Sequence, residues 1–135
     1  MRLPRRGQAA RGGQRGSATV EFALVLPLLF VVTLGLIQVG LLARDQLLVE
    51  AAARAGARAA AVQPDDAQAR EAALAAAPAL DPASVSVSVL RDGQRGLPVT
   101  VRVGYVDPIR VPFIGWLVGE SVAIDATAVM RQEFG

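Results

Sequence analysis

Side chains that commonly carry out catalysis are scarce in this chain of 135 residues. It has no histidine, which removes the usual general base and the commonest metal ligand. It has no cysteine, which removes thiol nucleophiles, disulfides and zinc–thiolate sites. The acids stand mostly one at a time, and helix capping explains the adjacent pair Asp65 and Asp66. We therefore expect no enzyme, no cofactor and no metal site.

The acid in the most informative position is Glu21. It is the first acid of the chain, and it directly precedes a long apolar run that begins at Phe22. A carboxylate there complements the positive end of a helix dipole. The residues alone leave two roles open, which are recognition of a partner at the membrane and a simple interfacial acid that reaches headgroup water.

The uncharged run from Phe22 to Ala43 is long enough to cross a membrane. As a helix it extends for about 33 Å, compared with a hydrocarbon core of roughly 30 Å. Most of its residues are Phe, Leu, Ile or Val, so insertion is favourable. Within it, Pro27 lacks an N–H group and frees the carbonyl of Ala23, which predicts a bend in the helix.

Flanking charge predicts the orientation of this helix. By the positive-inside rule the arginine-rich N-terminus lies in the cytoplasm and residues after about 44 lie outside, because Arg44 is balanced at once by Asp45. A secretory signal peptide is the rival interpretation, although its apolar region normally covers only about 7–15 residues. No acid precedes Glu21, and the arginines on its N-terminal side are Arg2, Arg5, Arg6, Arg11 and Arg15.

Basicity is a property of this tail rather than of the whole chain. Five of the 14 basic residues lie before Gly16, whereas all 12 acids follow it, so residues 17–135 carry a net charge of −3. A binding partner made of nucleic acid is therefore not expected, and the tail fits a lipid bilayer with anionic headgroups better.

The junction at Gly16-Ser17-Ala18-Thr19-Val20-Glu21-Phe22 resembles the cleavage signature of type IV pilin-like precursors. The resemblance is closest to the TadE-like family, minor pseudopilins of the tight-adherence (Flp) pilus apparatus, and covers about residues 16–62. It implies that a prepilin peptidase cuts after Gly16 and leaves Ser17 as the new N-terminus. It also implies that the carboxylate of Glu21 pairs with the free amine of Ser17 in a neighbouring subunit, with Phe22 beginning the apolar helix. The alternative is a flexible Gly-Ser junction that is never cut.

Three segments follow from these observations. Residues 1–16 form a basic, disordered leader, because they combine glycine and arginine with little apolar bulk. Residues 17–62 form one long helix, with the membrane span at about 22–43. Residues 63–135 form a small α+β part outside the cytoplasm.

This outer part should contain one short helix and three strands. The helix is expected over Ala67–Ala77, with a cap from the preceding aspartates. Alternation of apolar and polar residues then predicts strands over residues 84–89, 99–103 and 122–131. The antiparallel sheet needs a cover for its apolar face, and the Ala-rich helix around Ala52, Gly56 and Ala60 can provide it. The same ridge could instead pack on a partner helix.

The uncharged segment 111–118 interrupts this pattern. It has two nearby prolines and contains Phe113, Leu117 and the only tryptophan, Trp116. Three uses remain open: folding onto the domain, resting in the headgroup layer where Trp is favoured, or contacting a partner protein.

Two functions fit the sequence. The first is a minor pseudopilin-like protein of the cytoplasmic (inner) membrane, or of the cell surface, that takes part in assembling a tight-adherence pilus or a related secretion apparatus. Its implied partners are prepilin peptidase, other pilin-like subunits and pilus assembly proteins. The second is a single-pass envelope protein whose outer domain is a binding module. Adhesion, secretion and DNA uptake are all compatible with the first.

Overall fold

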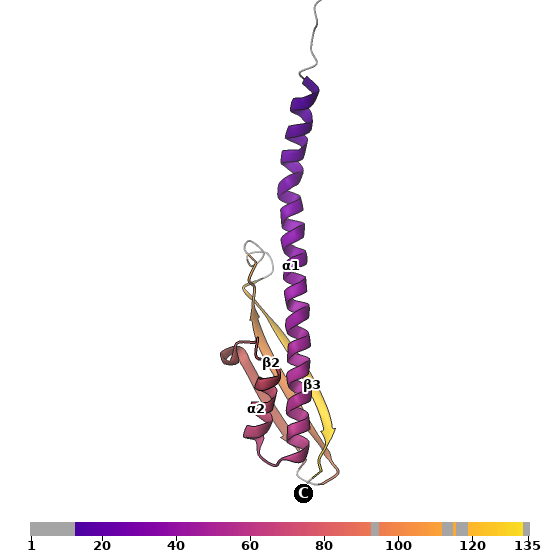
Figure 1. Ribbon diagram of the computed structural model, residues 1–135, viewed down its shortest axis with the longest axis vertical. Coiled ribbons are helices and arrows are strands. Elements are labelled where there is room, and N and C mark those ends of the chain that lie inside the picture. Colours follow the sequence, from indigo (N-terminus) through magenta and orange to yellow (C-terminus); the bar gives the residue numbers. More distant parts are fainter. Residues whose placement is uncertain (1–12, 93–94, 112–114, 116–118, 134–135) are drawn as a thin grey trace, which may run out of the picture.

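A long helix and a small sheet domain beside its C-terminal half make up the fold (Figure 1). The computed structural model describes residues 13–92, 95–111, 115 and 119–133. The α+β class expected from the sequence is confirmed. The elements are helix α1 (Gly13–Val62), helix α2 (Asp66–Ala76), the 3-10 turn η1 (Pro82–Ser84), and strands β1 (Val85–Arg91), β2 (Pro98–Pro108) and β3 (Ser121–Arg131).

Helix α1 has 50 residues and is about 75 Å long. It begins at Gly13, so the last residues of the expected disordered leader are helical. The reason is that Gln14 and Arg15 favour a helix and nothing between them and Val62 stops it. The helix also continues through Pro27, whose missing N–H group removes one backbone bond without ending the element.

Helix α2 turns back along the end of α1. Its N-cap is Asp65, whose Oδ1 accepts a hydrogen bond from the N–H of Ala67 at 2.9 Å. This cap was expected from the sequence, and the helix begins one residue earlier than predicted, at Asp66. The two helices approach closely at Gly56, where an added Cβ would lie 3.2 Å from the Cβ of Ala73.

The three strands form an antiparallel sheet in the order β1-β2-β3. In this register Val101 lies opposite both Val89 in β1 and Ala128 in β3. Strand β2 is longer than the segment 99–103 predicted from alternation. It extends to Pro108 because Tyr105 and Asp107 continue the buried face that the valines begin.

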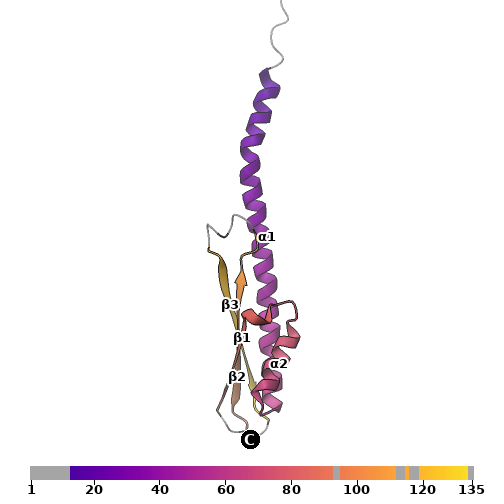
Figure 2. The same ribbon diagram turned by 90° about the vertical axis from the view of Figure 1, so that its left-hand side faces the viewer.

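The hydrophobic core lies between one face of this sheet and the C-terminal half of α1 (Figure 2). Small side chains on α1 permit close approach, and an added Cβ at Gly56 would lie only 3.1 Å from Cγ1 of Val101. The small-residue ridge therefore packs on its own sheet and on α2 rather than on a partner. The buried residues of α1 in this cluster are Val49, Ala52, Ala53, Ala57, Ala60 and Ala61.

The distal end of α1 is fastened to the domain by polar contacts. Arg91, at the end of β1, donates to the carbonyl of Ala60 at 2.6 Å and pairs with Asp66 at 2.8 Å. The N–H of Glu133 donates to the carbonyl of Ala61 at 2.8 Å. These bonds satisfy carbonyls in the last turn of α1 that have no partner within the helix. Helix and sheet therefore form one folded unit.

Candidate membrane anchor and assembly site

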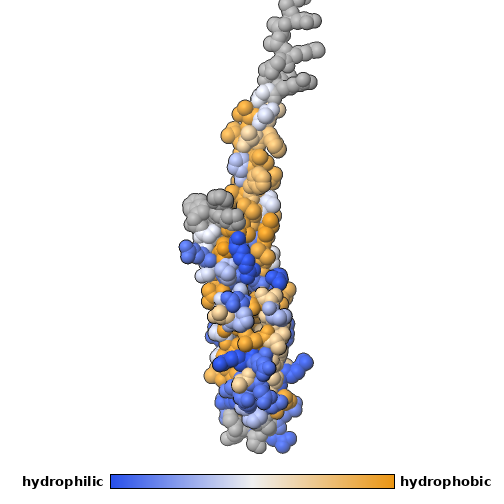
Figure 3. Space-filling view, turned by 60° about the vertical axis from the view of Figure 1, so that its left-hand side comes forward, coloured by the Kyte–Doolittle hydropathy of each residue, from blue (hydrophilic) through white to orange (hydrophobic). Residues whose placement is uncertain are grey.

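The N-terminal half of α1 stands free of the domain and is covered with large apolar side chains (Figure 3). Within the described residues, one helix is long and apolar enough to cross a membrane, and its most apolar window is entirely unburied. The large apolar side chains of this half that are at least half exposed are Val20, Phe22, Leu24, Val25, Leu28, Leu29, Phe30, Val31, Val32, Leu36 and Ile37.

The residues of the expected cleavage junction lie in the first turns of α1. Gly16 and Ser17 are exposed, and an added Cβ at Gly16 would meet nothing within 4 Å. The backbone at Gly16–Ser17 is helical, so a peptidase that requires extended backbone would have to open this turn. Cleavage itself stays a prediction.

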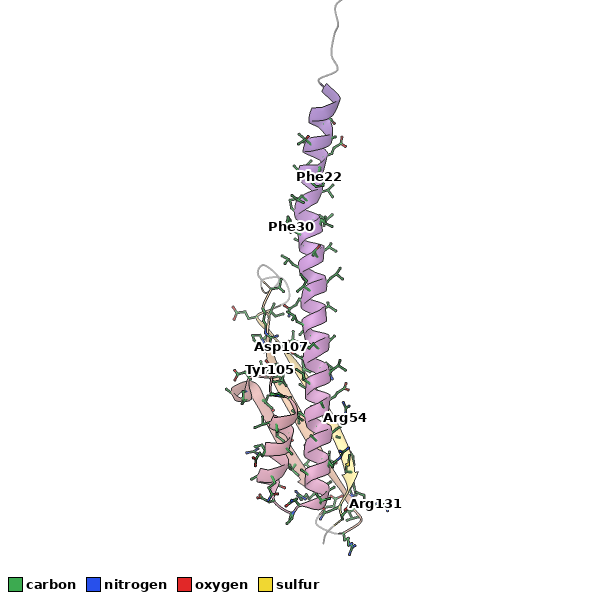
Figure 4. All side chains as sticks on the ribbon, viewed as in Figure 1. Phe22, Phe30, Arg54, Tyr105, Asp107 and Arg131 are labelled. Atoms are coloured by element: carbon green, nitrogen blue, oxygen red, sulfur yellow. The ribbon has the colours of Figure 1, made fainter. Side chains whose placement is uncertain are left out.

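Glu21 lies one helical turn beyond Ser17 and contacts it. The hydroxyl of Ser17 donates to Oε1 of Glu21 at 2.9 Å, and both side chains are exposed. The next residue, Phe22, points away from the helix axis into open space, as does Phe30 farther along (Figure 4). Ser17 and Glu21 can therefore meet within one chain, as well as between chains as the resemblance implies.

Two other expectations are not tested. Helix α1 passes through Pro27 without a break, and the bend expected there stays a prediction. Phe113, Trp116 and Leu117 lie outside the described residues.

The structure brings together a polar cluster that was not expected from the sequence, in which four side chains are buried and Arg110 is exposed. Its residues are Gln38, Asp45, Tyr105, Asp107 and Arg110. Asp45 on α1 and Asp107 at the end of β2 are both fully buried. The guanidinium of Arg110 joins them, with Nη1 3.0 Å from Oδ2 of Asp45 and Nη2 3.1 Å from Oδ1 of Asp107. Nη2 also donates to the hydroxyl of Tyr105 at 3.3 Å. Two turns above Asp45, Oε1 of Gln38 accepts from the N–H of Val111 at 3.2 Å.

This arrangement sets the electrostatics of the cluster. Burial raises the pKa of Asp107, and the nearby carboxylate of Asp45 raises it further, while Arg110 lowers it only in part. Burial alone lowers the pKa of Arg110, but the two carboxylates outweigh that effect and its pKa is raised. Arg110 stays a cation, and it ties the connection after β2 to α1.

One signal for this cluster was available in the sequence. The inward alternation of Val99, Val101 and Val103 continues to Tyr105 and Asp107, which places an acid on the buried face. The position of Asp45 carried no such signal, because its partner Arg110 is 65 residues away. The sequence shows Asp45 only as a balance to Arg44, with which it also pairs at 3.5 Å.

Nothing in this cluster is typical of a metal centre. The described residues contain no group of three or more His, Cys, Asp or Glu side chains that could hold a metal ion. The two carboxylates of the cluster are instead joined by a guanidinium. The cluster is an internal ion pair between the helix and the sheet.

Comparisons with known proteins identify the N-terminal part of the chain. Residues 16–58 match the family model for TadE-like proteins. No curated protein and no solved structure matches the chain. The matched segment runs from the expected cleavage junction through the exposed apolar helix into the core helix of the domain. With that match the resemblance expected from the junction residues is confirmed for residues 16–58: this part of the chain is a TadE-like segment.

Proposed function

We propose that this protein is a minor pseudopilin-like component that takes part in assembling a tight-adherence (Flp-type) pilus or a related secretion apparatus. Its role in this proposal is structural, and its partners are the bilayer, a prepilin peptidase, other pilin-like subunits and pilus assembly proteins. One observation carries the proposal: the TadE-like segment is a single helix that is exposed and apolar in one half and forms the core of a folded domain in the other.

The exposed half supports a membrane anchor. An apolar surface of this extent is unusual on a soluble monomer, and it surrounds the helix rather than forming a stripe. The arginine tail supports a cytoplasmic N-terminus, with the domain on the other side of the cytoplasmic membrane. In this topology the domain is displayed where an external fibre or apparatus is built.

Leader removal would prepare this anchor for assembly. Cutting after Gly16 would give Ser17 a free, cationic amine. The contact between Ser17 and Glu21 shows that residue 17 lies within reach of this carboxylate. The amine can then pair with Glu21 of its own chain or of a neighbour, and pairing between chains would hold two helices side by side while reducing the cost of an acid near hydrocarbon.

Mass spectrometry of the N-terminus in membrane-extracted protein tests the cleavage step. A mature chain that begins at Ser17 is expected, and Gly16→Leu should block the cut because a bulky side chain hinders approach to the backbone. Gly35→Leu is the matched control, since an added Cβ meets nothing within 4 Å at either glycine. An intact leader in wild-type protein would instead favour the membrane-anchored binding module.

Substitution of Glu21 tests the assembly step. Glu21→Gln keeps the shape of the side chain but removes its charge, so insertion should persist while incorporation into the apparatus falls. Glu50→Gln is the matched control, because Glu50 is an acid on the same helix that pairs with Arg54 at 3.4 Å and accepts a hydrogen bond from Gln46, both within the domain half. Normal assembly with Glu21→Gln would contradict the proposed role of Glu21.

A further inference from the structure

We infer that the membrane-facing end of the domain is a contact surface for phospholipid headgroups, and that it sets how deeply α1 enters the bilayer. We call this end the shoulder and define it as Gln38, Ile109, Arg110, Val111 and Glu120. The inference rests on the proposed membrane crossing, and its test separates a wrong depth from a wrong crossing.

Length alone leaves the position of the bilayer undecided. A hydrocarbon core of roughly 30 Å needs about 20 helical residues. Residues 22–43 satisfy this requirement, and so do residues 16–37, because each window extends for about 33 Å. The choice between them has to come from what surrounds the helix.

Burial changes abruptly at Gln38. Every described residue of α1 from 16 to 37 is exposed or only partly covered, whereas Gln38 is 4% exposed. The cover is the connection between β2 and β3, whose Val111 donates its N–H to Gln38 at 3.2 Å. The ends of β2 and β3 that this connection joins lie beside α1 (Figure 2).

The shoulder is held rigidly to the helix. Arg110 bonds Asp45, two turns from Gln38 on α1, at 3.0 Å. The N–H of Ile109 donates to the carbonyl of Glu120 at 2.9 Å, which joins the two sides of the connection. With both contacts in place, the shoulder cannot slide along α1 without breaking the ion pair between Arg110 and the buried Asp45.

The chemistry of the shoulder suits headgroups and not hydrocarbon. It exposes one cation, Arg110, and one anion, Glu120. Ile109 beside them is half-buried. Suppose that residues 22–43 filled the hydrocarbon core. The charged groups of the shoulder, and the ion pair that Arg110 forms with Asp45, would then approach or enter the core, at a free-energy cost for each charge. If the core ends at Gln38, the same groups meet phosphate and choline groups at the surface.

This depth has a consequence at the other end of the helix. About 30 Å below Gln38 the helix reaches Thr19. Glu21 then lies within one turn of the cytoplasmic boundary, at the edge of the hydrocarbon. The shoulder would therefore fix the depth at which this carboxylate meets a partner.

Single cysteines introduced into this cysteine-free chain report the depth directly. The full chain is reconstituted in phosphatidylcholine vesicles with the domain outward and treated with a membrane-impermeant maleimide. We expect labelling of Ala43→Cys to match that of Leu47→Cys, with loss of labelling for Val32→Cys. All three positions are exposed in the protein, so folding is not at risk.

A second pair of variants reports the headgroup contact. The two variants are Glu120→Cys and Arg131→Cys. Glu120 directly precedes β3 and Arg131 is its last residue, so the two positions are about 36 Å apart, and both side chains are exposed. Figure 4 places Arg131 at the end of the domain remote from the free helix. A fluorophore at position 120 should be quenched by headgroup spin-labelled phosphatidylcholine, whereas the same fluorophore at position 131 should not be.

The outcomes separate the possible errors. Protection of Ala43→Cys equal to that of Val32→Cys would overturn the inferred depth, and absence of quenching at position 120 would overturn the headgroup contact. Equal labelling at Val32, Ala43 and Leu47 would instead show that the helix does not cross the bilayer, which refutes the proposed crossing itself.

Discussion

The two halves of α1 are one continuous helix, but their relation to solvent is opposite. From Val20 to Ile37 the side chains are mostly large and apolar, and most are more than half exposed. From Val49 to Ala61 the inward side chains are mostly alanines, and they are fully buried. In a soluble protein the larger apolar residues would be the buried ones.

This contrast shows how one helix can be selected for two solvents. In the half proposed to cross the bilayer, large apolar side chains would gain free energy from contact with lipid chains. In the domain half, the sheet lies so close that even a Cβ at Gly56 would lie 3.1 Å from Cγ1 of Val101. Large side chains are therefore favoured in the half proposed to contact lipid, and small side chains are favoured in the half that packs on protein.

The largest effect on membrane insertion is expected from a charge in the middle of the exposed half. Leu29→Arg places a cation near the centre of the span and should cost about 3–4 kcal/mol of insertion free energy. Most of the protein should then be lost from the carbonate-resistant membrane fraction. Leu47→Arg is the control, because Leu47 is 63% exposed but lies beyond the span. Retention of Leu29→Arg in the membrane would contradict a lipid environment for this half.

Two glycines of α1 give the next largest contrast. Gly56→Leu should destabilise the domain by about 1–3 kcal/mol, because the new side chain would clash with Val101 and Ala73. Gly35→Leu should leave domain stability unchanged, since an added Cβ there meets nothing within 4 Å. Thermal unfolding of both variants in detergent micelles measures the difference. Equal melting temperatures would show that the domain half is not closely packed.

The junction between the halves should respond to pH. Because the folded state raises the pKa of Asp107 above its ordinary value of 3.8, the folded state binds this proton more tightly than the unfolded state does. Its stabilising contribution is present below pH 3.8 and is lost as the pH rises through the folded pKa. Relative to Asp107→Asn, the wild-type protein should therefore lose stability as the pH rises above 3.8 and through the raised pKa of Asp107.

Chemical unfolding across that pH range measures this contribution, with Asp125→Asn as the control. Asp125 is an exposed acid of the same sheet that pairs with Arg102 at 3.1 Å, so its substitution controls for the removal of one acid from the domain. A wild-type profile parallel to that of Asp107→Asn would show that burial of Asp107 does not govern its proton.

Much of the fold follows from periodicity along the chain. The change from a helical period to alternation after residue 83 predicts the three strands, and the Val and Ser faces of β1 are half-buried and exposed as expected. Strand β2 was underestimated because Gly104 and Asp107 weaken the apolar pattern, although Tyr105 and Asp107 are both buried. Local alternation identifies a strand better than it locates the end of the strand.

The polar cluster could not be predicted in the same way. Asp45 and Arg110 are far apart in sequence, and an isolated Asp after Arg44 looks like ordinary charge balance. Gln38 lies inside the apolar run, whereas its partner, the N–H of Val111, is 73 residues away. Contacts of this kind depend on how the sheet is placed on the helix, which no local pattern encodes.

The smallest expected effect concerns the cap of α2. Asp65→Ala removes the bond from Oδ1 to the N–H of Ala67 and should cost the domain about 1 kcal/mol. Asp81→Ala is the control, because Asp81 makes the same kind of bond to Ala83, at 3.0 Å, but caps only a short 3-10 turn.

Thermal unfolding in micelles and carbonate extraction would be measured on both variants. Asp65→Ala should lower the melting temperature more than Asp81→Ala does, because the buried Ala69 and Ala73 of α2 complete the core against the domain half of α1. Neither variant should change membrane extraction, because the contacts of α2 with α1 lie in the domain half of that helix and not in the apolar half. A loss of membrane retention in Asp65→Ala would show that the two halves depend on each other, and that the free half is not an autonomous anchor.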